Sequence, residues 1–149
     1  MFVVVRVLHD LSNRIMASYT IAVASLAIDA PLRWTDNAIS QHRIDGVVSE
    51  RRGVSRRITF PALLTLAVAR ELVNELQVSL AHALTLASEL AREPEGAEIC
   101  LAHTVLRVDL PAIRHDLQQR LADALESAPL PARGRPPLGA GNKEGRGVR

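Results

Sequence analysis

Polar side chains recur at four-residue steps in the segment that follows Pro31. Arg33, Asn37 and Gln41 would share one face of a helix, because residues four apart lie one above the other. Arginine makes bidentate hydrogen bonds to guanine, and asparagine and glutamine make them to adenine, each pair giving about 1 to 3 kcal/mol of discrimination. This spacing therefore predicts recognition of base edges in the major groove of a DNA duplex.

The wider set of candidate DNA contacts in this segment contains its other polar and aromatic side chains. The set comprises Arg33, Trp34, Thr35, Asn37, Ser40, Gln41 and His42, with Arg43 just beyond the expected helix. A solvated polar face is the alternative interpretation. Trp34, the only tryptophan, has two interpretations: a core residue beneath the following β segment, or a contact to phosphate or sugar.

Four arginines gather a few residues further on, around Gly53. They are Arg51, Arg52, Arg56 and Arg57, at the tip and on the second strand of an expected β-hairpin. A short hairpin beside a groove-bound helix lies along the DNA backbone, so these side chains are better explained as phosphate contacts than as base contacts. Surface solubility is the alternative, but it does not require such clustering.

Catalytic chemistry finds little support in the sequence. Serine, histidine and acidic residues are present, but no nucleophile elbow, phosphate loop or glycine-rich fingerprint surrounds them. Cys100 is the only cysteine, which excludes an internal disulfide and a multi-thiolate metal site. The five histidines show no metal-ligand spacing. We therefore expect a protein that is not an enzyme, with no cofactor and no metal.

Length and composition predict one globular domain that is mainly α with a small β component. The chain has 149 residues, of which 48% are hydrophobic and 3% aromatic, so the core must consist of aliphatic side chains that suit packed helices. No uncharged apolar run approaches the roughly 18 residues that a membrane-spanning helix needs. With one cysteine, the expected location is the reducing cytoplasm, without a membrane partner.

Helix and turn signals in the first half predict a helix-turn-helix followed by a hairpin. Thr20 can cap a helix that continues to Ile28, and Pro31 suits the first turn of a second helix that runs to about His42. Two short helices with so tight a connection are typical of a helix-turn-helix. Asp45-Gly46 is a turn signal, and the hairpin that follows it consists of a strand at 47–48, a basic turn at 49–53 and a strand at 54–59.

Two further helices and an N-terminal extension complete this half of the chain. Pro61 opens a helix that continues to about Leu76, and Ser79 can cap another that ends near Leu90. The β-prone run from Phe2 to Leu8 lies in an extension, residues 1–18, and is a candidate edge strand.

Residues 97–128 are predicted to be a strand followed by a helix that joins two copies of the chain. The run from Ile99 to Leu110 has too little polar alternation for a strand with one solvated face. The helix after Pro111 carries an apolar stripe formed by Ile113, Leu117, Leu121 and Leu125. Self-association would cover this patch, and pairing would raise avidity for DNA. The alternative is that the segment folds back on its own domain, pairing with the N-terminal strand.

Charge is segregated along the chain, although the net charge is only +2. Residues 33–57 hold six arginines against three acids, for a net charge of +3, and residues 129–149 carry +4. Residues 70–128 carry −5. A compact basic block beside an acidic body is typical of proteins that bind polyanions, although chance clustering of surface arginines gives the same composition.

The order of helix, turn, helix, basic hairpin and two further helices over residues 19–90, within an expected domain of residues 19–91, resembles the winged helix-turn-helix DNA-binding domain of the MerR family. The matching stretches are Tyr19-Thr20-Ile21, Gly46-Val47-Val48, Arg51-Arg52-Gly53, Arg56-Arg57-Ile58 and the run Glu71–Leu80. The resemblance implies a bacterial transcription regulator that binds double-stranded DNA as a homodimer.

The chain departs from the MerR pattern at several places. Ala38-Ile39-Ser40-Gln41 replaces an aromatic pair late in the recognition helix, and Ala30 stands where a capping serine commonly precedes the proline. The long dimerising coiled coil and the thiolates of metal sensors are missing. Neither base preference nor dimer geometry is therefore transferable, and no small-molecule effector is evident.

The tail, residues 129–149, is rich in proline, glycine and arginine and is predicted to be disordered. Its segment Arg133-Gly134-Arg135-Pro136 resembles the core of an AT-hook, an extended motif that enters the minor groove of A·T-rich DNA. The usual flanking basic residues are replaced by Ala132 and Pro137. An inert tail is the alternative.

Together these patterns predict a nucleoid-associated, sequence-specific or architectural DNA-binding protein, a MerR-like transcriptional regulator acting as a homodimer. Two alternatives remain open. One is an accessory DNA-bending protein of a mobile element, similar to an excisionase. The other is a protein-interaction or antitoxin-like adaptor that uses residues 97–128 to bind its partner.

Overall fold

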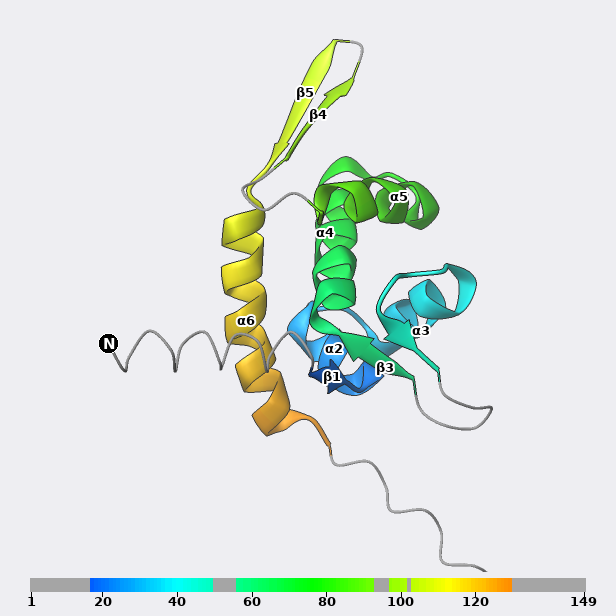
Figure 1. The fold of residues 1–149 in the computed structure, drawn as a ribbon, viewed down its shortest axis with the longest axis vertical. Coiled ribbons are helices and arrows are strands. Elements are labelled where there is room, and N and C mark those ends of the chain that lie inside the picture. Colours follow the sequence, from blue (N-terminus) through cyan, green and yellow to red (C-terminus); the bar gives the residue numbers. More distant parts are fainter. Residues whose placement is uncertain (1–16, 50–55, 93–96, 102, 130–149) are drawn as a thin grey trace, which may run out of the picture.

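The computed structural model describes residues 17–49, 56–92, 97–101 and 103–129, which form a mainly helical fold with small antiparallel β elements (Figure 1). The elements in chain order are β1 (Ser18–Tyr19), α2 (Ile21–Ala27), α3 (Leu32–Gln41), β2 (Val47–Val48), β3 (Arg57–Thr59), α4 (Phe60–Leu76), α5 (Leu80–Leu90), β4 (Ala97–Leu101), β5 (Thr104–Val108) and α6 (Leu110–Ser127). Among these described helices, none is both long and apolar enough to cross a membrane.

A tight connection joins α2 to α3, as the sequence predicts. The side chain of Thr20 caps α2 by accepting a hydrogen bond from the backbone N–H of Val23 at 3.4 Å. Asp29 adopts the left-handed conformation with φ of 50°, which reverses the chain after α2. The extended backbone of Pro31 then begins α3 at the next residue.

A three-stranded antiparallel sheet follows, in the order β1-β3-β2. Ile58 of the central strand lies opposite Tyr19 on one side and Val47 on the other. The hairpin between β2 and β3 confirms the predicted strand pairing, with β3 shorter than expected, whereas β1 was not predicted. Gly46 begins this hairpin with φ of +89°, and a Cβ there would lie 2.2 Å from Thr59 Oγ1, so glycine fits both the backbone and the space. The candidate strand over 2–8 lies outside the described residues.

The central helix α4 contributes more buried side chains to the core than any other described element. Eight of its side chains are buried, around most of its circumference: Ala62, Leu63, Leu64, Leu66, Ala67, Val68, Ala69 and Leu72. Helix α4 ends at Gln77, which adopts the left-handed conformation with φ of 53°. The predicted Ser79 then caps α5. α5 packs against α4, with Ala83, Leu84, Ala87 and Leu90 buried.

The C-terminal part differs from the expected strand and helix. Two strands, β4 and β5, form an antiparallel hairpin that extends beyond the helices (Figure 1). The single strand expected over 99–110 is therefore wrong: the chain turns near His103, so the apolar run is divided between two paired strands.

Helix α6 lies along α2 and α4 of its own chain (Figure 1). Leu117 and Leu121 are only 3% and 6% exposed, so the prediction that they form a dimer interface is wrong. They are core residues because α2 offers the facing surface that the sequence pattern did not reveal. Ile113 is half-buried and packs on the same core, and Leu125 is the one member of the predicted stripe that is largely exposed. For α6, the alternative of a segment folded back on its own domain is correct, with α2 and α4 as its described partners. The pairing of this segment with the run 2–8 lies outside the described residues.

Candidate nucleic-acid interface

Helix α3 has one exposed polar face and one buried apolar face. Arg33, Asn37 and Gln41 are all exposed, as their four-residue spacing predicts. The opposite face places Ala38 and Ile39 in the core, which fixes the orientation of the helix. The polar face is therefore held toward solvent by packing on the other side.

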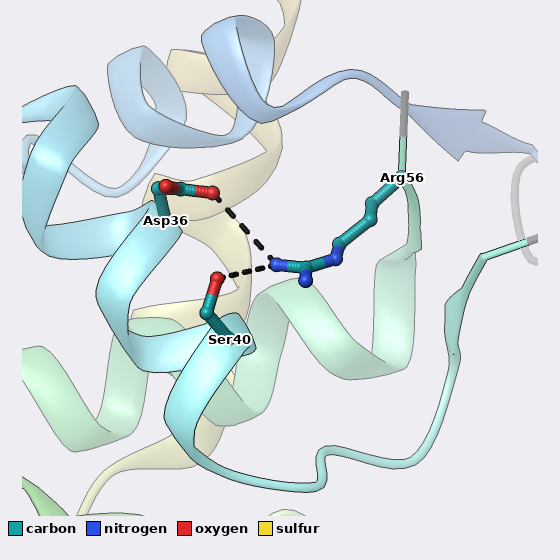
Figure 2. A network of polar contacts seen from close by, with 3 residues as sticks. All are labelled: Asp36, Ser40 and Arg56. Carbon is teal, nitrogen blue, oxygen red and sulfur yellow. Dashed lines mark hydrogen bonds and ion pairs between the residues drawn. The ribbon is translucent and has the colours of Figure 1, made fainter. Parts of the chain in front are cut away.

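An ion pair connects this face to the start of β3. The Arg56 guanidinium donates a hydrogen bond to the Ser40 hydroxyl and lies 3.8 Å from a carboxylate oxygen of Asp36 (Figure 2). Asp36 and Ser40 are one helical turn apart, so both can reach the same guanidinium. The contact ties the hairpin to α3 across 16 residues of sequence.

Asp36 is the residue that sequence reasoning missed at this surface. Its carboxylate offsets part of the Arg56 charge, so Arg56 acts as a brace between two elements and only partly as a free cation. The side chain of Arg56 is 34% exposed and that of Asp36 is 57% exposed, so the pair is solvent-screened and is worth at most about 1 kcal/mol. The signal available in sequence was the four-residue spacing of an acid and a serine on the predicted polar face.

Arg43 and Arg57 are the freer cations of this surface. Both are exposed, and neither makes an ion pair with any residue that the structure describes. Arg43 follows the end of α3, whereas Arg57 lies in β3 next to the brace. Together with Arg33 of α3 they are three exposed cations on α3, just after it and on β3, which suits contact with a polyanion.

Trp34 packs on the core and is half-buried, which supports the core alternative of its two interpretations. The guanidinium carbon of Arg70 in α4 lies 5.3 Å from the ring centroid, within the range of a cation–π contact. The described ring contact of Trp34 is therefore with Arg70 of α4, whereas the sequence predicted that Trp34 would pack beneath the hairpin.

Thr35 is wrong as a DNA contact. It is 0% exposed, because it lies on the face of α3 that packs on the core. Its hydroxyl has no hydrogen-bond partner among the described residues. A buried hydroxyl without a partner lowers stability, because it gives up its hydrogen bonds to water.

Replacing Thr35 with valine should therefore leave DNA binding unchanged and raise the free energy of unfolding by up to about 1 kcal/mol, since valine has a similar shape without the unpaired hydroxyl. Urea denaturation and a DNA titration measure the two effects. Thr85→Val serves as the control, because it makes the same change at an exposed position on α5, outside the α3 face. A folded Thr35→Val protein with tenfold weaker DNA binding would restore Thr35 to the interface.

Of the remaining candidate residues, the structure describes His42 but not the arginines of the hairpin turn or the tail motif. His42 ends α3 as its C-terminal cap and is half-buried. Arg51 and Arg52, and the tail motif Arg133-Gly134-Arg135-Pro136, lie outside the described residues. In the described ranges no three histidine, cysteine or acidic side chains gather in a way that could hold a metal ion.

No family model matches the chain, and neither a curated protein nor a solved structure matches it either.

Proposed function

We propose that this chain is a sequence-specific or architectural DNA-binding protein, a MerR-like winged helix-turn-helix regulator that acts as a homodimer. The observation that carries the proposal is the exposed face of α3, with Arg33, Asn37 and Gln41 in line; Arg43 after the helix and Arg57 on β3 are exposed as well. The protein works without catalysis or a cofactor, in the cytoplasm and associated with the nucleoid.

In this proposal α3 enters the major groove and the β2–β3 hairpin lies along the flanking backbone. Ten residues give α3 a length of about 15 Å, and the major groove is about 12 Å wide, so the helix spans a few base pairs. The Arg56 contact with α3 favours one angle between helix and hairpin in the free protein, which lowers the ordering entropy that DNA binding costs.

Asn37→Ala should reduce sequence discrimination about tenfold at one or two base pairs, because a bidentate contact to adenine is lost. Specific sites are first selected from a random duplex library, and affinities for selected and scrambled duplexes are then measured by fluorescence anisotropy. Asn74→Ala is the matched control, an exposed asparagine at the far end of α4. Equal losses on both duplexes would assign α3 to backbone contacts alone.

The homodimer is proposed to form through the β4–β5 hairpin. An isolated two-stranded hairpin is marginally stable in water, and this one extends beyond the helices (Figure 1). Val105 is 59% exposed and lies opposite Cys100, which is also exposed. A second copy would cover this face in a two-fold arrangement and place two α3 helices on one duplex.

The wild-type chain should sediment as a dimer at micromolar concentration, and Val105→Glu should sediment as a monomer, because the new charge lies at the proposed contact. Leu125→Glu adds the same charge on α6, where the side chain is 56% exposed, and should remain dimeric. A monomeric wild type, or dissociation by the Leu125 change alone, would contradict this interface.

The two alternatives predict different measurements. An excisionase-like DNA-bending protein binds clustered sites cooperatively, so its footprint extends over several adjacent sites. An adaptor or antitoxin-like protein co-purifies with a stoichiometric partner and binds DNA weakly. The exposed α3 face favours DNA binding over the adaptor, because an adaptor has no need for aligned arginine, asparagine and glutamine side chains.

A further inference from the structure

A groove of about 1070 Å³ lies on the molecule between β1, the segment after α3, and helices α4, α5 and α6. Its lining includes the buried side chains of Tyr19, Ile44, Leu64, Leu84 and Leu121. The volume is at the upper end of the range of small-molecule sites, and such sites combine an apolar surface with a few polar groups.

The charged part of the lining is predominantly cationic. Three arginines line the groove, Arg43, Arg92 and Arg114, against one carboxylate, that of Asp45, among the lining residues described. None of the three guanidinium groups has an ion-pair partner within the described ranges. Arg114 is half-buried, so its charge is less screened by water than an exposed one would be.

We propose that this groove binds an amphipathic monocarboxylate, a molecule with an extended apolar body and one carboxylate group. The apolar body would lie on Leu64, Leu84 and Leu121, and the carboxylate would pair with Arg114, whose guanidinium can bind it bidentately. Charge complementarity selects an anion over a neutral or cationic ligand of the same shape. The apolar run over 2–8 is a poorer match for a cationic lining, because its one charged residue is Arg6.

The proposed site adjoins elements that position the α3 face. Tyr19 belongs to β1, which pairs with β3, and His42 and Arg43 directly follow α3. Arg43 lines the groove, so a bound carboxylate that offsets its charge would weaken a cation proposed to contact DNA, and ligand and DNA would oppose each other. This coupling rests on the proposed function, whereas binding of the carboxylate itself does not.

The test is calorimetric titration of the full chain with decanoate, below its micelle concentration and without DNA. Decanoate should bind, and decanol and decyltrimethylammonium should bind at least tenfold more weakly. Arg114→Ala should weaken decanoate at least tenfold, while Arg120→Ala, an exposed arginine on α6 that does not line the groove, should leave it unchanged. Ala122→Trp, which adds bulk at an exposed lining position, should block binding.

Several results would overturn the proposal. Absence of decanoate binding would do so, as would equal binding of decanol or equal weakening by the Arg114 and Arg120 changes. Binding of decanoate by a chain shortened to begin at Met16, but not by the full chain, would also overturn it, because residues 1–15 would then be the occupant of the groove. Decanoate binding without an effect on DNA affinity would contradict the coupling alone, and absence of DNA binding would contradict the proposed function while leaving the carboxylate site intact.

Discussion

Replacing Leu117 with alanine should lower the free energy of unfolding by about 2 to 5 kcal/mol, which is a 30-fold or larger change in the unfolding equilibrium. Leu117 is 3% exposed on the face of α6 that packs on α2 and α4. The lost stability is the sum of two free energies: the transfer free energy of the removed methine and methyl groups, and the cost of the cavity that remains. Because α2 supports α3, the variant should also lose DNA binding at temperatures where it unfolds.

Leu125→Ala is the matched control, since Leu125 lies on the same helix and is 56% exposed. It should change stability by no more than about 0.5 kcal/mol. Urea denaturation of both variants measures the difference. If Leu117→Ala kept full stability and instead dissociated a dimer, α6 would be an interface between copies, as its sequence pattern alone indicates.

Replacing Arg43 and Arg57 together with alanine should weaken binding to any duplex roughly 10- to 100-fold at 0.1 M salt. Each neutralised phosphate releases counterions, so two lost contacts reduce the slope of log affinity against log salt by about 2. Both side chains are exposed and without described ion pairs, so the fold should tolerate the change.

The matched control removes two other exposed arginines, with Arg92→Ala and Arg120→Ala combined. It lowers the net charge equally but changes residues after α5 and on α6, outside the α3 face and outside the β4–β5 hairpin. Affinity should then fall far less than in the first pair. Equal losses in the two double variants would mean that overall charge, and not this surface, governs DNA binding.

Local signals in the sequence predicted most of the fold. Thr20, Ser79 and the prolines before α3 and at the start of α4 and α6 each fix a helix end through backbone chemistry that depends on a few neighbours. The exposed face of α3 followed from periodicity in the same way. These features were predictable because their causes lie within one or two helical turns.

The failures concern contacts between distant segments. Thr35 has a polar side chain and a helical position that suit either face, and only the packing of α3 on the core decides that it is buried. Leu117 and Leu121 form an apolar stripe that could face a second copy or α2 equally well. β1 depends on pairing with a strand 40 residues later, and the Arg56 brace joins residues 16 and 20 apart.

The most direct test of the central claim is the salt dependence of wild-type binding to duplex DNA. Fluorescence anisotropy between 50 mM and 300 mM salt gives the slope of log affinity against log salt. The exposed cations Arg33, Arg43 and Arg57 predict a slope of about −3 or steeper for each bound copy. Absence of binding at 50 mM salt, or a slope near zero, would contradict the assignment of this chain as a DNA-binding protein.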